Sequence, residues 1–321
     1  MQTLSINKKG HLWQLHKIAR KKGLHTHLFK LDQKYTSLLV SNKKTYKIFD
    51  GHKLGYYPST NKHFVELCNS KIESEKVLKS YGYNILNSID IRPNTFTNFE
   101  SYCKYIFKHL PADFPLLIKP EVGLRGIGIH TVNTETQLLH SVKKLYSSNK
   151  NFLIQQTTYL PEFRILFTLG KAIFVHSKGF PVIKGDGKQS ALAHFSTIDS
   201  AKRDRNFFTH QLHQIGLNTN SILPEGVSVP YHITRKGTFD TVYADNIPSQ
   251  LSRWAKKLGK DLNTDTIGID VFIDGEFNKT TSYRIIEINA NPAFMYIKHK
   301  YKRADVVERH CTRILDASFP D

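Results

Sequence analysis

The sequence predicts a mixed α+β fold, and three observations carry this prediction. Short segments rich in β-branched and aromatic residues come in pairs separated by polar turns, which is typical of antiparallel hairpins. Longer segments with apolar residues at three- and four-residue spacing lie between these pairs and predict amphipathic helices. No G-x-G-x-x-G sequence follows a first strand, so a Rossmann domain is not indicated. With 321 residues, of which 40% are hydrophobic, the chain is long enough for two or three lobes.

The first 70 residues are predicted to form a small N-terminal α/β lobe. The segment His11–Lys22 is basic and places apolar residues at helical spacing, which predicts a helix packed on the first sheet. A transit or membrane-surface helix is the alternative for this segment. Two short strands are expected at Thr36–Val40 and Tyr46–Phe49, joined by the polar turn Ser41–Lys44. No motif in this lobe indicates its role.

Residues 71–155 are predicted to form a second lobe of helices and strands. Helical periodicity gives three helices, and short apolar runs give the extended segments between them. A Gly-rich loop follows the second extended segment. The helices are expected at Ser74–Tyr81, Phe99–Leu110 and Thr134–Tyr146, and the extended segments at Asn84–Ile91, Pro115–Lys119 and Phe152–Gln155.

Residues 156–321 are predicted to form a third lobe with two hairpins and two helices. Apolar runs broken by short polar turns indicate the hairpins, and an amphipathic pattern indicates the first helix. The expected elements are a hairpin over Arg164–His176 with its turn at Leu169–Lys171, a polar loop over Lys178–Ser190, a helix over Ile247–Leu262, strands at Thr266–Ile273 and Tyr283–Ile288 around a turn at Asp274–Lys279, and a helix after Lys302.

Basic residues dominate the charge, because 46 Lys and Arg against 27 Asp and Glu give a formal charge of +19. This excess favours anionic partners, while an evenly spread charge would give only loose polyanion attraction. No RNA-recognition motif or aromatic stacking signature is visible in the sequence, so a nucleic-acid partner is not expected.

Three scattered cysteines without metal-ligand spacing fit a reducing cytoplasm, which is the expected location. No apolar stretch approaches the roughly 18 residues that span a bilayer, so no membrane partner is expected either. The N-terminus also lacks the apolar core of a signal peptide. The number of chains in the assembly stays open, with a homo-oligomer as one option.

The segment Ile286–Pro292 and the segment Gly268–Val271 carry the sharpest candidate site. Residues two apart in a strand share a face, so Glu287 and Asn289 point the same way, and an antiparallel neighbour brings Asp270 beside them. Carboxylate and amide oxygens suit Mg²⁺, and buried carboxylates without a cation would be costly. These three residues are therefore the predicted metal ligands, with satisfied hydrogen bonding as the alternative.

A strand ending in Lys119 runs into a loop with three glycines, Gly123, Gly126 and Gly128. Glycines permit close backbone approach, so successive N–H groups can surround phosphate oxygens while the lysine adds positive charge. The loop lacks the GK[ST] ending of a P-loop, and glycine-rich turns also occur in hairpins that bind nothing. Upstream of an acidic metal cradle, however, it fits phosphoryl transfer, which depends on positioning and charge neutralisation.

The order of these pieces resembles the ATP-grasp superfamily, and within it cyanophycin synthetase and related amino-acid ligases. The resemblance covers roughly residues 70–297. The pieces are Glu73–Lys76 opening a helix, FPLLIKP, GLRGIGI, FLIQQ, the Glu162–Arg164 step, PVIKGDGK, GIDV and IEINANP.

The resemblance implies an ATP-grasp fold, with two α+β lobes clasping ATP between roughly 71–155 and 156–321 and a small N-terminal lobe. It implies ATP and one or two Mg²⁺, with Mn²⁺ as a substitute, held at Asp270, Glu287 and Asn289. Arg164 and Lys178 would serve the reaction at the phosphate and acyl phosphate. The implied nucleotide contacts are Lys76, Lys119, Gly123, Arg125, Gly126, Gly128, Gln155, Gln156 and Thr158.

The resemblance implies an ADP-forming ligase that activates a carboxylate as an acyl phosphate and joins it to an amine, on an amino acid or acidic peptide. Gln156 stands where the family usually has an acidic residue. The cations Lys184, Arg235 and Lys236 are the expected substrate contacts, and the last two favour an anionic substrate. The alternatives are a kinase on the same fold that acts on a small polyanion such as an inositol phosphate, and a basic nucleic-acid-binding protein. Polymerisation is not implied, because no Mur-ligase-like half follows the motifs.

Overall fold

The computed structural model describes residues 10–30, 36–49, 62–122, 127–199, 203–234, 242–274, 282–290, 292 and 294–320. The chain forms two compact units, each built from separate stretches of sequence. The first unit contains residues 1–69, 163–176 and 241–321, and the second contains residues 70–162 and 177–240. The three-lobe division drawn from the motifs stays a prediction. Within the described ranges, no helix is both long and apolar enough to cross a bilayer.

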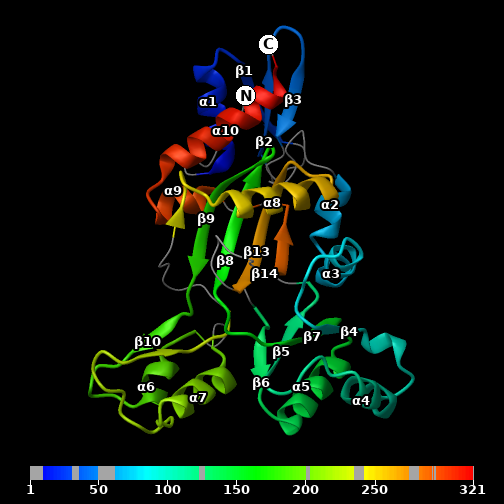
Figure 1. Ribbon diagram of the computed structural model, residues 1–321, viewed down its shortest axis with the longest axis vertical. Helices are drawn as coiled ribbons and strands as arrows, with labels where there is room; N and C mark the ends of the chain where they lie inside the picture. Colours follow the sequence, from blue (N-terminus) through cyan, green and yellow to red (C-terminus); the bar gives the residue numbers. More distant parts are fainter. Residues whose placement is uncertain are drawn as a thin grey trace. The chain divides into compact units, whose positions relative to one another are not determined.

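The first unit begins with a helix packed on a three-stranded antiparallel sheet. The helix is α1 (His11–Lys21), and the sheet has the order β1 (His25–Lys30), β2 (Thr36–Ser41), β3 (Tyr46–Phe49). The apolar stripe of α1 is buried in one core with residues of β2, β3 and the C-terminal helix α10 (Ala304–Ser318). The predicted packed helix is therefore confirmed, and Figure 1 shows α1 and α10 beside this sheet.

A five-stranded sheet forms the other part of the first unit. Its order is β12 (Val242–Tyr243), β9 (Lys171–Lys178), β8 (Glu162–Thr168), β13 (Thr266–Asp274), β14 (Ser282–Asn289), with the first residue of β8 and the last two of β9 belonging to the second unit. Helix α8 (Ser249–Asp261) lies across this sheet in Figure 1. A Cβ at Gly259 of α8 would lie 2.7 Å from the ring of Phe167, so glycine is needed for this close packing. Helices α2 (Lys62–Leu67) and α9 (Phe294–Lys300) complete the described part of the unit.

The second unit contains a four-stranded sheet of order β4 (Ser88–Ile91), β7 (Phe152–Gln156), β5 (Leu116–Pro120), β6 (His130–Val132). Its core is a cluster of apolar residues from this sheet together with α4 (Phe99–Lys108) and α5 (Glu135–Ser147). Helix α3 (Lys71–Ser80) precedes the sheet and is capped by Ser70, and a short 3₁₀ helix spans Pro93–Thr95. The sheet thus carries the strand that ends at Lys119 and the strand that contains Gln155.

A smaller part of the second unit lies between residues 177 and 234. It contains the hairpin of β10 (Val182–Lys184) with β11 (Ser228–Pro230), and helices α6 (Ala191–Ser196) and α7 (Arg205–Gln214). Asp204 joins it to the four-stranded sheet, because its buried carboxylate accepts hydrogen bonds from the backbone N–H (2.8 Å) and hydroxyl of Thr131 in β6.

Most predicted elements appear within a few residues of their expected limits, and two corrections stand out. The expected polar loop Lys178–Ser190 contains strand β10, because Val182 and Ile183 pair with β11 and Ile183 is buried in an apolar cluster. Strand β1 was not predicted, because its alternation of His, Thr and Leu has too few apolar residues to indicate a strand. Helices α2, α6, α7 and α9 were also missed; α2, α6 and α9 have seven residues or fewer.

Candidate functional site

The predicted metal ligands lie on two paired strands of the first unit. Antiparallel pairing of β13 with β14 places Asp270 opposite Glu287 and Gly268 opposite Asn289. The register shifts between Asp270 and Val271, so Ile286 is an extra residue in a bulge. Because partners in a ladder share a face, Asp270, Glu287 and Asn289 project from the same side of the sheet. The strand alternation had predicted this juxtaposition.

Gly268 makes room for the turn that follows β14. A Cβ at this position would lie 3.0 Å from the Cβ of Pro292 and 3.5 Å from the Cβ of Asn289. The side-chain Nδ2 of Asn289 is buried and has no hydrogen-bond partner among the residues that the structure describes. Rotation of the amide by half a turn puts its oxygen at that place, where a cation would satisfy it.

Arg164, predicted to act at the phosphate, contacts one of the predicted metal ligands. It lies on β8, the strand next to β13, and its Nε donates to Oδ1 of Asp270 at 2.7 Å. Its Nη2 donates to Oδ2 of the same carboxylate, so the contact is bidentate. Asp270 is 3% exposed, and burying its charge would be costly without such a partner. The guanidinium thus balances the charge of Asp270.

The donor set fits a hard divalent cation. Two carboxylates and an amide on one face supply oxygen ligands, which Mg²⁺ prefers together with waters and substrate phosphates. Within the described ranges, no group of three or more His, Cys, Asp or Glu side chains could hold a metal. A site at these strands therefore depends on the amide oxygen of Asn289 and on oxygens from a ligand, which is the usual situation for Mg²⁺ at a nucleotide.

A cysteine lies beside this strand pair, and sequence reasoning gave it no role. Burial raises the pKa of Cys68 to about 12, against the opposing effect of a backbone hydrogen bond from Ala290, and the charge of Glu287 raises it further. The thiol is therefore neutral at physiological pH and acts as a small apolar neighbour of the site. Cys68 precedes the motif that begins at Ile286 by 218 positions, and this separation hides the proximity in the sequence.

In the second unit, Lys119 and Gln155 converge on a buried carboxylate. The ammonium of Lys119 lies 3.0 Å from Oε1 of Glu75, and Nε2 of Gln155 donates to the same oxygen at 3.2 Å. The hydroxyl of Ser88 donates to Oε2. Lys119 is 4% exposed and Glu75 is 8% exposed. The predicted phosphate-binding lysine is thus held by a carboxylate that sequence reasoning did not single out, although it lies one residue before Lys76.

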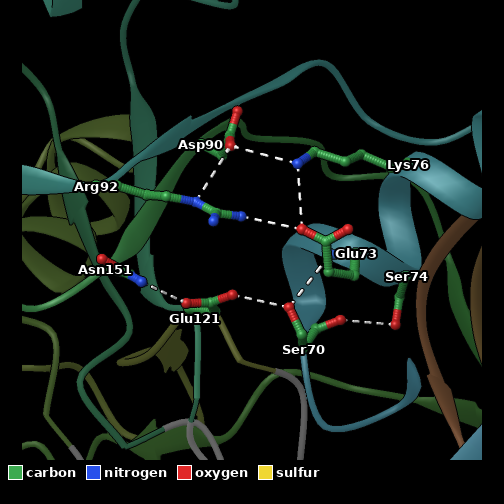
Figure 2. A network of polar contacts seen from close by, with 8 residues as sticks. All are labelled: Ser70, Glu73, Ser74, Lys76, Asp90, Arg92, Glu121 and Asn151. Carbon is green, nitrogen blue, oxygen red and sulfur yellow. Dashed lines mark hydrogen bonds and ion pairs between the residues drawn. The ribbon is translucent and has the colours of Figure 1, made fainter. Parts of the chain in front are cut away.

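Lys76, the other predicted phosphate contact, lies on the exposed side of α3. Its Nζ is 3.1 Å from Oε1 of Glu73 and 3.9 Å from Oδ2 of Asp90, and Arg92 also contacts Glu73 at 3.0 Å (Figure 2). Hydrogen bonding from Lys76, and secondarily from Arg92, lowers the pKa of Glu73. The two lysines therefore differ in solvent exposure, because 54% of the Lys76 side chain is exposed against 5% of the Lys119 side chain.

Glu121, the residue that opens the Gly-rich stretch, is anchored through both carboxylate oxygens. Ser70 donates to Oε1 at 2.7 Å and Asn151 donates to Oε2 at 2.9 Å, and dashed lines mark both hydrogen bonds in Figure 2. Lys71 also donates to its backbone carbonyl at 3.4 Å. The hydroxyl of Ser70 accepts the N-cap hydrogen bond of α3 from Glu73, so one serine links the start of α3 to the start of the loop.

The described end of the loop is also closely packed. Gly128 has a φ of 77°, and a Cβ there would lie 2.8 Å from Cγ of Pro120, so glycine is required. Its carbonyl accepts a hydrogen bond from Nδ1 of His130 at 3.3 Å. Five residues with a predicted role lie outside the described residues: Gly123, Arg125, Gly126, Arg235 and Lys236.

Three of the remaining predicted residues occupy the ends of strands, and Thr158 lies in the loop after β7. Gln156 ends β7 opposite Leu116, and the hydroxyl of Thr158 accepts from the N–H of Leu160 at 3.3 Å. Lys178 ends β9, and its Nζ is 2.8 Å from Oε1 of Glu162. Lys184 is exposed at the end of β10.

The loop after Lys184 is organised by Asp186. Its carboxylate accepts from the backbone N–H groups of Gln189 at 2.9 Å and Lys188 at 2.8 Å. These hydrogen bonds lower the pKa of Asp186 to about 2, so it stays ionised at physiological pH. The arrangement fixes the backbone of the GDGK segment, which directly follows Lys184, an expected substrate contact.

No protein-family model and no curated protein matches the sequence. Among solved structures, the chain is similar to a bifunctional glutathione synthetase from Pasteurella multocida, with a TM-score of 0.55 and 17% identity, over 96% of this chain and 43% of that chain. The chain therefore spans less than half the length of that protein.

Two further solved structures are similar at lower scores. A D-alanine–D-alanine ligase from Bacillus anthracis complexed with ATP has a TM-score of 0.47 and 15% identity, over 80% of this chain and 67% of that one. The ATP-grasp ligase PsnB complexed with its minimal precursor has a TM-score of 0.47 and 12% identity, over 81% and 63%. The predicted α+β fold of the ATP-grasp type is confirmed. The closer resemblance to cyanophycin synthetase stays a prediction.

Proposed function

We propose that this chain is an ATP-dependent carboxylate–amine ligase, which activates a carboxylate as an acyl phosphate, releases ADP and forms an amide bond. The observation that carries the proposal is the paired set of Asp270, Glu287 and Asn289 on one face, with the guanidinium of Arg164 bound to Asp270. Two carboxylates, an amide and an arginine in one place suit a reaction in which phosphate charge must be neutralised. The fold and the ordered motifs support the same proposal.

In the first unit, Asp270, Glu287 and Asn289 would hold Mg²⁺, and Mn²⁺ would substitute for it. The ion would supply charge neutralisation at the phosphate oxygens. Arg164 lies next to this set and would bind the phosphate and acyl phosphate once the cation takes its place at Asp270. No nucleophilic side chain is needed, because the acyl phosphate already carries a good leaving group.

In the second unit, Lys119 would bind the nucleotide phosphates, and Gln155, Gln156 and Thr158 would lie along the adenine. The buried contact between Lys119 and Glu75 keeps the ammonium oriented, so a phosphate must share the lysine with this carboxylate. Lys76, with its two carboxylate neighbours, would bind phosphate only by exchanging them.

The substrate would be an amino acid or an acidic peptide. The exposed Lys184 supports this, because it precedes the backbone fixed by Asp186 and offers a cation to an anionic group. Lys178, held by Glu162 at 2.8 Å, would serve the reacting carboxylate.

The test is product identification with purified chain, Mg²⁺-ATP and a panel of amino acids, short acidic peptides and inositol phosphates. A product lighter by one water than its two precursors, formed together with ADP, is the expected result. A product heavier by one phosphate would instead establish a kinase. Asp270→Asn and Glu287→Gln are expected to abolish turnover, and Lys188→Ala provides a surface control near the substrate segment.

A further inference from the structure

Arg164 occupies the middle of a row of side chains that crosses one face of the five-stranded sheet. On one side of it, Asp270 of β13 accepts two hydrogen bonds from its guanidinium. Strand β9 lies on the other side, because the order of the sheet places β8 between β9 and β13. The side chains of β9 on this face are therefore the second set of neighbours that the charge of Arg164 can contact.

His176 of β9 lies on the same face of the sheet as Arg164. Leu166 of β8 and Phe174 of β9 are buried in one core cluster, whereas Phe167 packs against α8 on the opposite face. Alternation along each strand gives Arg164 the face of Leu166, and it gives His176 the face of Phe174. The row thus ends in an imidazole on the side away from the predicted metal ligands.

Two tyrosines, from α9 and from the turn that follows it, pack on this end of the row. The ring centroid of Tyr301 is 5.2 Å from that of His176 and 5.2 Å from that of Phe174, the second contact being edge-to-face. The ring of Tyr296 is 5.7 Å from that of Tyr301 and 6.2 Å from that of His176. These rings form one aromatic group on the β9 side of Arg164.

Tyr301 is the ring in this group that the charge of Arg164 affects. Burial raises the pKa of its phenol and Tyr296 raises it further, while the guanidinium of Arg164 acts in the opposite direction and lowers it. Such an effect falls off with distance, so the ring and the guanidinium lie close together. The phenol is neutral at physiological pH and offers an uncharged π face. The ring of Tyr296 differs, because the ammonium of Lys300 already lies over it at 5.3 Å from its centroid.

Asp270 can bind a divalent cation only when Arg164 releases it, and the inference drawn here rests on that proposed metal site. The side chain of Arg164 is 25% exposed, so its released charge would be only partly hydrated and would need a new contact. We propose that Tyr301 is a positioning residue, whose ring receives the guanidinium of Arg164 when a divalent cation takes its place at Asp270.

An aromatic ring suits this role better than a second carboxylate would. Guanidinium groups stack on aromatic faces, and the contact is weak enough for a phosphate group to replace it. A carboxylate would hold the arginine by charge-assisted hydrogen bonds and would compete with phosphate for it. On the ring of Tyr301, the guanidinium stays on the same face of the sheet and is available to the phosphate and acyl phosphate of the proposed reaction.

The experiment titrates the purified chain with Mn²⁺ alone and measures free Mn²⁺ by electron paramagnetic resonance, so that neither nucleotide nor substrate is needed. Tyr301→Leu removes the ring and is expected to weaken Mn²⁺ binding about fivefold, because the released guanidinium loses its contact. Tyr301→Phe keeps the ring and should bind Mn²⁺ nearly as tightly as the unaltered chain. Asp270→Asn identifies the site, because it should abolish this binding.

A double-mutant cycle separates the positioning role from a structural one. In the Arg164→Gln chain there is no guanidinium to receive, so the addition of Tyr301→Leu should leave the Mn²⁺ affinity unchanged. Tyr296→Leu is the matched control, because it removes a neighbouring ring that already contacts Lys300, and it should change the affinity less than twofold. Thermal melting checks that each variant is folded, and Tyr301→Met, with a longer side chain, replaces Tyr301→Leu if the leucine variant unfolds.

Four results would overturn this inference alone. They are an unchanged affinity of Tyr301→Leu, an equal loss in Tyr301→Phe, an equal loss in Tyr296→Leu, and the same loss from Tyr301→Leu in the Arg164→Gln chain. Failure of the proposed function gives a different result: Mn²⁺ binding that does not depend on Asp270 would remove the metal site itself, and this inference with it.

Discussion

Replacing Glu75 with glutamine tests how strongly the buried contact with Lys119 holds the second unit together. Both side chains are nearly inaccessible to solvent, at 8% and 4% exposure, and their charged atoms are 3.0 Å apart. Glutamine keeps the size and can still accept from Ser88, but it leaves the ammonium of Lys119 without a compensating charge. Breaking one side of a buried ion pair costs about 3 kcal/mol or more, because the remaining charge stays desolvated.

The same helix provides a matched control. Glu73 lies two residues earlier on α3 and also contacts a lysine at 3.1 Å, but both partners are about half exposed. Solvent screens such a pair, so Glu73→Gln should cost less than about 1 kcal/mol. A second variant, Glu75→Gln with Lys119→Met, removes the stranded charge and should recover most of the lost stability.

The measurement must separate the two units. Both tryptophans, Trp13 and Trp254, belong to the first unit, so their fluorescence in urea follows that unit. Hydrogen exchange on peptides from β5 and β7 follows the sheet that carries Lys119. The loss of about 3 kcal/mol should appear in the exchange of these two strands and leave the tryptophan transition in place. A loss no larger than that of Glu73→Gln would refute the reasoning that this pair is effectively buried.

Four further results are expected. Burial raises the pKa of Asp204 above its ordinary value of 3.8. The stability contributed by its protonated form is complete below pH 3.8 and is lost as pH rises through the raised folded-state pKa. In urea titrations, the free energy of unfolding of Asp204→Asn should therefore increase relative to that of the unaltered chain as pH rises above 3.8, and a difference that does not change with pH would contradict this. Gly185→Ala would put a Cβ within 2.7 Å of two backbone oxygens and should destabilise the chain by about 2 kcal/mol or more. For comparison, Gly216 has open space around it but a φ of 72°, so Gly216→Ala should cost about 1 kcal/mol. The thiol of Cys68, with its pKa near 12, should be alkylated far more slowly at pH 8 than in urea, as mass spectrometry of the labelled peptide can measure. Arg164→Gln removes the ion-pair partner of Asp270, so in the absence of nucleotide it should tighten Mn²⁺ binding by about tenfold. Electron paramagnetic resonance titrations measure this affinity, and weaker binding would show that the arginine supports the metal site.

The sequence predicted those parts of the fold in which local pattern and tertiary packing agree. Strand β3 has the limits expected from its residues, and the helix at α1 differs by one residue at its end, because apolar side chains at the right spacing face the core in both. Strand β10 was hidden because only Val182 and Ile183 are apolar within a polar stretch, and its pairing with β11 is made by residues more than 40 positions away. Such pairing leaves no local signal.

The candidate site shows the same limit. Alternation alone placed Glu287 and Asn289 on one face, and the bulge at Ile286 does not disturb it, since the extra residue comes before the pair. Glu75 was not identified, because its importance lies in contacts with Lys119 and Gln155, which are 44 and 80 positions distant. A glutamate in an amphipathic helix looks like a solvated residue until the tertiary structure buries it.

Four of the basic residues that the sequence assigned to the nucleotide and the reaction are each held by a carboxylate of the same unit. The pairs are Lys76 with Glu73, Lys119 with Glu75, Arg164 with Asp270, and Lys178 with Glu162. Each carboxylate partner keeps its cation oriented and offsets its positive charge. In the proposed ligase, a phosphate group would have to compete with the carboxylate at each of these cations, so free phosphate or a simple polyanion would gain little. A nucleotide with a bound divalent cation would face less competition, because the cation could bind the carboxylate that the arginine releases. In the proposed ligase, the pairing at Asp270 would therefore favour metal-bound nucleotide over bare anions, and this selectivity would follow from charge exchange at a single side chain.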